Sequence, residues 1–131
     1  FFTHWAITCG LCLHPDVRGQ AIERVHLVTP NMPYVDRPKP TSGLMGKFSW
    51  QYSFAAALLD GKVTMASFTD RRRFKPDMES LLGKVTVEMR DDIRGVVAEG
   101  CYVVAEVVLA DGRRLSARCD GPPGSWTGPP A

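Results

Sequence analysis

The second half of the chain shows the alternation of apolar and polar residues that is typical of strands with one buried face. Between residues 84 and 90, Val85, Val87 and Met89 alternate with polar residues, so their side chains would point to the same face of a sheet. A hairpin is expected further along, because Asp111 and Gly112 both tolerate the positive φ angles of a tight turn. The predicted strands are segments 22–29, 84–90, 102–109 and 114–119.

Other segments follow the helical period, with apolar residues three or four positions apart. The predicted helices are segments 3–13, 48–59 and 76–82. In the second of them, the apolar stripe consists of Phe48, Tyr52, Ala55, Ala56 and Leu59. Trp50 and Phe54 lie off this stripe, so we expect them on an exposed face of the helix. The first helix should end near Leu13, because His14 precedes Pro15 and a residue before proline avoids helical backbone angles.

Together these elements predict an α+β fold, in which a mostly antiparallel sheet of about four strands is covered on one face by helices. The length of 131 residues suits one domain with a modest core. We assign residues 1–120 to this domain and residues 121–131, which are rich in proline and glycine, to a tail without regular structure.

The charge of the chain is nearly balanced, with 16 basic and 14 acidic residues and a formal net charge of +2. This balance argues against nucleic-acid binding through phosphate neutralisation. No apolar run approaches the roughly 18 residues that span a bilayer. The N-terminus does not resemble a signal peptide, so we expect a cytoplasmic protein, mitochondrial if the source is a eukaryote. The basic run from Arg71 to Arg73 is expected to lie in water.

Four cysteines are present, and we expect free thiols because nothing marks the chain as secreted. Cys9 and Cys12 form a C-x-x-C pair, which is compatible with a redox dithiol, half of a zinc site near His4 and His14, or two buried structural thiols. The redox alternative needs a strand before the helix and a parallel sheet, and neither is predicted. We favour the structural interpretation and expect no metal site. Nucleotide-binding and zinc-protease motifs are absent from the sequence.

Three polar residues are candidates for contacts with a substrate. His4 lies at the start of the first predicted helix, where a histidine can move a proton near neutral pH, or simply cap and pack. Tyr34 lies in the proline-rich segment 31–40, whose prolines restrict the backbone and would hold the phenol in place. Arg37 is close by and offers a forked donor for a carboxylate. The alternative is a loop tyrosine beside a solvated arginine.

Three stretches together resemble the C-terminal part of the MmgE/PrpD family. They are Thr3-His4-Trp5, the segment from Asn31 to Pro40 with its Tyr34-Val35 and Arg37-Pro38 pairs, and the run from Lys47 to Gly61. The likeness covers nearly the whole chain, and within the family it is greatest to cis-aconitate decarboxylase. Family members are cofactor-independent lyases of di- and tricarboxylates, such as 2-methylcitrate dehydratase and cis-aconitate decarboxylase, with a large helical domain and a smaller α+β domain.

The resemblance implies that this chain is the small domain and completes a site between two domains. It implies Tyr34 as a substrate-binding residue and leaves His4 as a possible catalytic one. The lysine and histidines that move most protons in the family precede Phe1, so the chain alone is expected to be inactive. The expected partners are a di- or tricarboxylate substrate, the helical domain of the same protein and a second copy in a homodimer, and no cofactor is expected. The alternative is a non-catalytic interaction or dimerisation module, motivated by Trp50 and Phe54.

Overall fold

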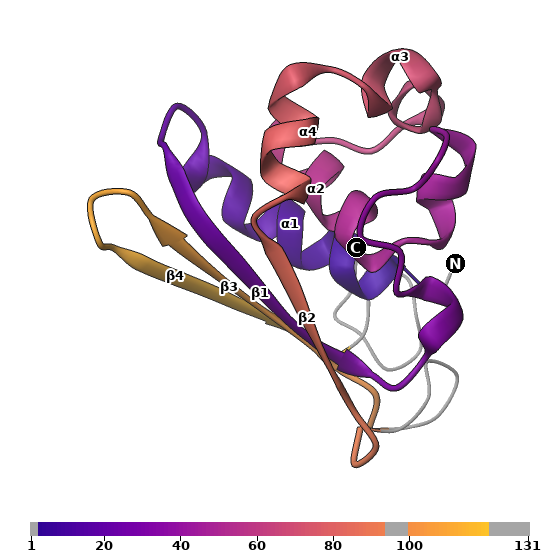
Figure 1. Cartoon of the computed structure of the whole chain (residues 1–131). Coiled ribbons are helices and arrows are strands. Elements are labelled where there is room, and N and C mark those ends of the chain that lie inside the picture. The colour runs from indigo at the N-terminus through magenta and orange to yellow at the C-terminus, as the bar shows by residue number, and fades with distance from the viewer. Residues whose placement is uncertain (1–2, 94–99, 121–131) are drawn as a thin grey trace.

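The computed structural model describes residues 3–93 and 100–120 and shows one four-stranded sheet with helices on one of its faces (Figure 1). The strands lie in the order β2-β1-β3-β4. Their bounds are Ile22–Pro30 for β1, Val85–Arg90 for β2, Val103–Leu109 for β3 and Arg114–Cys119 for β4. The predicted α+β class and all four strands are confirmed, with ends shifted by one residue at most. The proposed tail, residues 121–131, lies outside the described residues.

The sheet is mostly antiparallel, as predicted, because β3 runs antiparallel to both β1 and β4. One pair was not foreseen: β1 and β2 are parallel, with Val25 opposite Val85. A parallel pair needs a long crossover connection. Here the segment between the two strands supplies that crossover and contains every helix except α1.

The helices all lie on the same side of the sheet (Figure 1). The α-helices are α1 (His4–Val17), α2 (Trp50–Asp60), α3 (Asp70–Arg73) and α4 (Pro76–Leu82), and the short 3-10 helices are η1 (Pro33–Val35), η2 (Leu44–Phe48) and η3 (Met65–Phe68). Among the described residues, none of these helices has both the length and the apolar character of a bilayer span.

Helix α1 continues one turn further than predicted and contains Pro15. The extra turn is held in two ways. Val17 is buried in the core, and the Nδ1 atom of His14 donates a hydrogen bond of 2.7 Å to the carbonyl oxygen of Leu58 in α2. Pro15 itself lies on the exposed side of the helix. The expected stop near Leu13 was therefore wrong, because tertiary contacts of the last turn outweigh the local cost of proline.

Helix α2 is buried all round rather than along one stripe. Every residue from Trp50 to Leu58 is buried, and the exposed fractions of Trp50 and Phe54 are 0%. The helix begins two residues later than the predicted start at Phe48, which lies in η2 and is 41% exposed. The expectation of an exposed face carrying Trp50 and Phe54 was wrong, since α2 is packed between α1, the sheet and the segments that follow it. The observation that motivated an interaction module is thereby removed.

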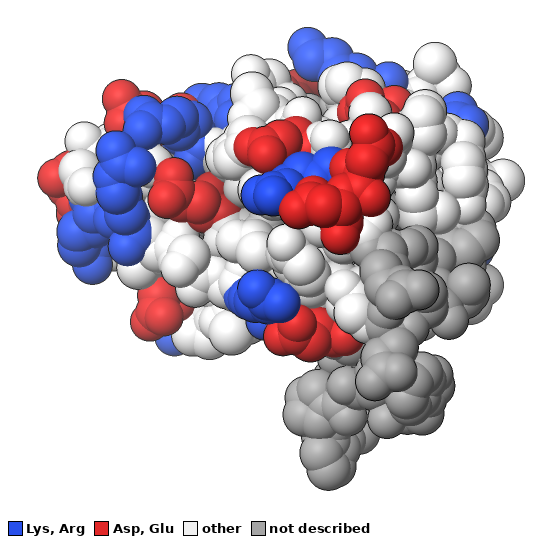
Figure 2. Space-filling view, turned by 90° about the horizontal axis from the view of Figure 1, so that it is seen from below, with Lys and Arg blue, Asp and Glu red and all other residues white. Residues whose placement is uncertain are grey.

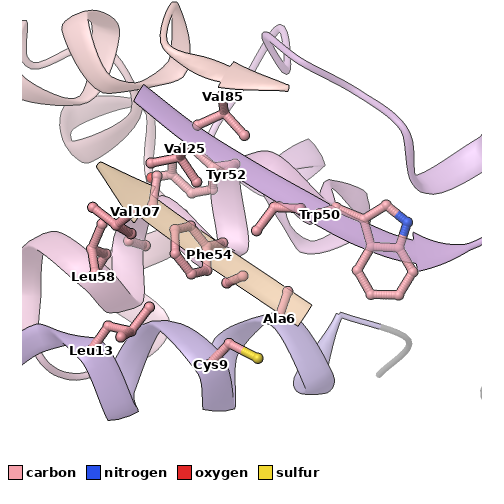
Figure 3. Packing of buried hydrophobic residues seen from close by; sticks show 14 of the residues in the cluster. Ala6, Cys9, Leu13, Val25, Trp50, Tyr52, Phe54, Leu58, Val85 and Val107 are labelled. Carbon is pink, nitrogen blue, oxygen red and sulfur yellow. The ribbon is translucent and has the colours of Figure 1, made fainter. Parts of the chain in front are cut away.

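The core forms where α1 and α2 meet the inner face of the sheet. Figure 3 shows Cys9 and Leu13 of α1, Phe54 and Leu58 of α2 and Val107 of β3 in this layer. The two helices approach closely at Gly10, where an added Cβ atom would lie 2.7 Å from the Cβ atom of Ala57. This tight packing fixes α2 relative to α1 and the sheet. The start of α2 is therefore a fixed support for the proline-rich segment 31–40, which is hydrogen-bonded to it.

Candidate functional site

The proline-rich segment 31–40, here called the arm, leaves the end of β1 and passes beside the start of α2. Its single helical turn, η1, carries Val35 inward and Tyr34 outward: Val35 is 0% exposed, whereas Tyr34 is 47% exposed. The buried valine anchors the turn on the core. The phenol of Tyr34 is therefore presented at the surface by a segment whose neighbouring residue is fixed in the interior.

Hydrogen bonds to the start of α2 hold the arm in place. The Ser49 hydroxyl donates a bond of 2.7 Å to the carbonyl of Arg37, and the Gln51 side chain accepts a bond of 3.1 Å from the Arg37 amide. The Gln51 amide also donates to the carboxylate of Asp36 at 2.6 Å. Ser49 and Gln51 are both buried. Buried polar groups that are fully paired make a rigid local structure, so the arm is organised in advance of any ligand.

Arg37 contributes to this arrangement from the arm itself. Its Nε atom donates a hydrogen bond of 2.8 Å to the carbonyl of Tyr34. The guanidinium therefore lies beside the backbone of the tyrosine. The structure brings these two predicted residues together.

A pocket of about 440 Å³ lies next to the N-terminal turn of α1. Its walls come from α1, η2 and the segment that leads into η3, and most of the lining side chains are apolar. The lining residues are Thr3, His4, Ile7, Leu11, Lys47, Val63, Thr64, Met65 and Phe68. None of these described lining residues is acidic, and His4 and Lys47 supply the nitrogen-bearing side chains.

The pocket walls are tied together by hydrogen bonds that leave its polar side chains in fixed places. The Thr3 hydroxyl donates to the carbonyl of Lys47 at 3.1 Å and so links α1 to η2. The η3 wall is held by a capping box between Thr64 and Ser67 and by a hydrogen bond from the Tyr52 hydroxyl to the carbonyl of Ser67. The Lys47 ammonium lies 5.7 Å from the centre of the Phe68 ring, within the range of a cation–π contact.

The protonation of His4 is set by its position in this wall. Burial, as the first cause, lowers the pKa of the imidazole below its ordinary value of 6.5. The neutral ring therefore predominates at neutral pH and can accept a proton.

The predicted residues fall into two neighbouring places rather than one. His4 lines the pocket, whereas Tyr34 and Arg37 lie on the arm and are not among the lining residues. The two places are joined through η2, because Lys47 lines the pocket and Ser49, two residues later, bonds to the arm. In the sequence, Lys47 was noted only as the start of a run that resembles the family, so its place in the pocket was not foreseen. Ser49 caps α2, since its oxygen accepts a bond of 2.9 Å from the Tyr52 amide.

Comparison with known proteins shows the family of the chain. A family model, the MmgE/PrpD C-terminal domain, matches residues 1–131. The chain belongs to the MmgE/PrpD family. One relative, the cis-aconitate decarboxylase of Mus musculus, is 35% identical over 108 residues, which make up 82% of this chain and 22% of that protein. The cis-aconitate decarboxylase of Homo sapiens is 36% identical over 135 residues, covering 97% of this chain and 28% of that protein. The chain thus spans less than a third of the length of these relatives.

In the basic run of this MmgE/PrpD domain, Arg71 is exposed as expected, but Arg72 and Arg73 are not solvated, contrary to the expectation. Arg73 is 3% exposed and donates to the carbonyl of Pro40 at 2.6 Å and to Glu79. Arg72 bonds to the carboxylates of Asp60 and Asp77. Burial disfavours its charge, but these hydrogen bonds outweigh that effect and raise the pKa of Arg72. The run therefore fastens α3 to α2, α4 and the end of the arm.

Charges elsewhere on the domain are mixed. Figure 2 shows Lys and Arg side chains next to Asp and Glu side chains on one face of the molecule. Several of the pairs join residues close in sequence: Arg90 with Asp92, Arg113 with Asp111, and Arg118 with Asp120. Such exposed pairs add little stability.

The C-x-x-C pair is split by the turn of α1. Cys9 is buried, whereas Cys12 is exposed. Burial raises the pKa of the Cys9 thiol to about 12, so it stays a protonated thiol that packs against the sheet. The structural interpretation holds for Cys9 and not for Cys12. In the described part of the chain, no group of three or more His, Cys, Asp and Glu residues is placed to hold a metal ion.

Proposed function

We propose that this domain forms one wall of the active site of a cofactor-independent lyase that acts on di- or tricarboxylates, of the 2-methylcitrate dehydratase or cis-aconitate decarboxylase type. The remainder of the same protein forms the opposite wall. Membership of the MmgE/PrpD family supports the proposal, as does similarity to two proteins named cis-aconitate decarboxylase. The short span of the chain relative to these proteins leaves room for a second domain.

The observation that carries the proposal is the anchored, outward-facing Tyr34. A polycarboxylate that leaves water loses its hydration and needs donors placed in advance. The arm meets this need, since the Ser49 and Gln51 bonds fix its backbone before any ligand arrives. In the proposed complex the phenol of Tyr34 donates to one substrate carboxylate. Arg37, aligned beside it, is a second donor.

Exposed apolar side chains near the pocket support a covering partner. Leu11 and Met65 line the pocket and are 38% and 89% exposed. We assign this surface to contact with the helical domain of the same protein, which would close the pocket and exclude water from the reaction. In this proposal the protein is cytoplasmic, or mitochondrial in a eukaryote, and forms a homodimer.

The test uses the parent protein that contains this chain. Purified parent and the isolated 131-residue chain are incubated with cis-aconitate and with 2-methylcitrate, and loss of each acid is followed by NMR. We expect turnover by the parent and none by the isolated chain, because the proton-moving residues lie in the other domain. Turnover by the isolated chain would contradict the proposed division of labour, and no turnover by the parent would refute the assigned substrate class.

The role of Tyr34 is tested by Tyr34→Phe in the parent. Loss of one hydrogen bond to a charged group costs about 1.5–3 kcal/mol, so we expect kcat/KM to fall by roughly 10- to 150-fold. Tyr102→Phe is the matched control, because the Tyr102 ring packs against the Arg118 guanidinium, whose central carbon lies 3.9 Å from the ring centre, and Tyr102 is not among the residues that line the pocket. Equal activities of the two variants would show that the Tyr34 phenol does not bind substrate.

A further inference from the structure

Gln51 is a polar side chain in the interior of the protein, and both ends of its amide group hold the arm. The residue is 1% exposed. Its side-chain oxygen accepts a hydrogen bond of 3.1 Å from the Arg37 amide, and its nitrogen donates one of 2.6 Å to the Asp36 carboxylate. A buried amide is costly unless its hydrogen bonds are made. Because its shortest bonds go to the arm, the arm explains why a glutamine stands at this position of α2.

Asp36 and Arg37 are neighbours of opposite charge that do not pair with each other. Such neighbours do pair elsewhere in the chain, since the Arg24 guanidinium lies 3.7 Å from the Glu23 carboxylate. Three other arginines pair with an acidic residue two positions away. In the described part of the chain no ion pair joins Asp36 to Arg37, and the Asp36 carboxylate is bonded to Gln51 instead. Gln51 therefore occupies the carboxylate that would otherwise be the nearest partner of Arg37.

The guanidinium of Arg37 is fixed at one nitrogen. Its Nε atom donates to the Tyr34 carbonyl at 2.8 Å, and the residue is partly buried. Among the residues that the structure describes, its two Nη atoms take part in no hydrogen bond or ion pair. The Nη atoms of an arginine form a fork that matches a carboxylate. A released Asp36 carboxylate would be the first anion to reach this fork.

We infer that Gln51 is a positioning residue for the substrate: it holds the Asp36 carboxylate away from Arg37 and so keeps the Arg37 guanidinium available to a substrate carboxylate. Gln51 itself does not touch the substrate. The inference rests on the proposed function and deepens it, because it names the residue that prevents an internal anion from replacing the ligand. Ser49 also bonds to the arm, but it caps α2 as well, whereas Gln51 can be changed with that cap in place.

The experiment replaces Gln51 by Met in the parent protein, alone and together with Asp36→Asn. Methionine has a similar length and fills the buried position without making either bond. Asp36→Asn removes the charge that would compete for Arg37, and as a single change it still offers Gln51 an acceptor oxygen. Gln20→Met is the matched control, because Gln20 is exposed and bonds to Arg113 at the other end of β1 from the arm.

Two readouts are used with each variant. Steady-state kinetics with cis-aconitate give KM and kcat separately. Calorimetric titration with tricarballylate, a saturated tricarboxylate that cannot undergo the reaction, gives the affinity without turnover. Thermal unfolding shows whether the variant is folded.

For Gln51→Met we expect KM to rise and the affinity for tricarballylate to fall by about 5- to 20-fold, because the released carboxylate competes with the ligand for Arg37. The change in kcat should be much smaller. Adding Asp36→Asn should return the affinity to within about threefold of wild type, although it restores no hydrogen bond, because the competing charge is gone. Asp36→Asn alone should not weaken binding, and Gln20→Met should behave as wild type.

Gln51→Glu is a second variant for the case in which Gln51→Met does not fold. Glutamate has the same shape and keeps an acceptor for the Arg37 amide, but it repels the Asp36 carboxylate instead of donating to it. It should weaken binding as Gln51→Met does. Asp36→Asn should again restore the affinity, because the amide introduced at one position can donate to the carboxylate introduced at the other.

The recovery separates positioning from a merely structural role. If Gln51 only supports the fold, Asp36→Asn restores neither KM nor affinity in the double variants, and this result overturns the inference. Failure of both Gln51 variants to fold overturns it as well. A kcat that falls while KM is unchanged also overturns it, because the change would then lie in the chemical step.

The same measurements separate the inference from the proposed function. Turnover by the wild type, with KM and affinity unchanged in the Gln51 variants, overturns the role of Gln51 and leaves the function standing. Tricarballylate binding that shows the loss and the recovery, without turnover of cis-aconitate or 2-methylcitrate, supports the inference and refutes the proposed reaction. Absence of both binding and turnover in the wild type overturns both.

Discussion

Ser49 stabilises both the start of α2 and the arm. Its removal should therefore lower the free energy of unfolding more than the loss of an ordinary helix cap does. Its oxygen accepts the Tyr52 amide hydrogen at 2.9 Å and caps α2, and its hydroxyl donates to the Arg37 carbonyl at 2.7 Å. Loss of a serine cap costs about 1 kcal/mol, and leaving a buried carbonyl without a donor costs about 1–3 kcal/mol. For Ser49→Ala we expect a total of about 2–4 kcal/mol in the free energy of unfolding.

The assay is urea unfolding of the chain, followed by circular dichroism. With an m-value of about 2 kcal/mol/M, the midpoint should fall by about 1–2 M. Thr69→Ala is the matched control, because the Thr69 hydroxyl likewise accepts from the Arg72 amide and donates to the Ala66 carbonyl, but both bonds are exposed and cap only the four-residue helix α3. That loss should stay near 0.5 kcal/mol, the lower end of the range for caps.

A second readout checks the arm directly. The Arg37 amide donates to Gln51, and we expect it to exchange its hydrogen faster in Ser49→Ala than in wild type, because the neighbouring Arg37 carbonyl is no longer held. If Ser49→Ala and Thr69→Ala lower the midpoint equally and Arg37 exchange is unchanged, then the hydroxyl does not fasten the arm and the reasoning fails.

Three further predictions concern stability and reactivity. Gly61 and Gly19 both have positive φ angles, so alanine should cost about 1–2 kcal/mol at Gly19. It should cost more at Gly61, where an added Cβ would lie 2.5 Å from an imidazole ring; equal urea midpoints for the two variants would contradict this. A thiol reagent at pH 8 should modify Cys12 rapidly and Cys9 only after unfolding, as mass spectrometry would show, since Cys9 is buried and its pKa is raised to about 12. Hydrogen bonding to an arginine lowers the pKa of Asp77 in the folded state, so its stabilisation is present above about pH 4 and is lost as the pH falls further. Asp77→Asn should make the loss of stability between pH 7 and pH 3 smaller by less than about 1 kcal/mol, because this side chain is 56% exposed, and an unchanged pH profile would refute the contribution.

The elements that sequence reasoning found are those with a local signal. The alternation of Val85, Val87 and Met89 is a property of seven consecutive residues, and it predicted β2 to within one residue. The burial of α2 is different, because it depends on what packs around the helix. A stripe drawn from the apolar residues of 48–59 assumes an exposed opposite face, but neighbouring segments cover α2 on all sides, and Phe54 is buried as completely as Ala55.

In the candidate site, too, sequence reasoning found the residues with a local signal and missed one whose place depends on tertiary contacts. His4 and Tyr34 were found because they lie in short segments that resemble the family, and the structure places His4 in a pocket wall and Tyr34 on an anchored turn. Lys47 carries no comparable local signal. It faces the pocket only because η3, about twenty residues later in the chain, folds back to present Phe68, and no period or spacing in the sequence reports such a contact.

The position of β1 in the sheet has a consequence for folding during synthesis on the ribosome. This strand is synthesised before the other three, yet both of its neighbours come much later: Val25 pairs with Val85 on one edge and with Val107 on the other. Until those segments emerge, both edges of β1 carry unpaired backbone groups, the condition in which strands associate with the wrong partners. A chaperone that binds the nascent chain while the crossover helices are being translated would therefore protect the unpaired edges of β1 from association with wrong partners.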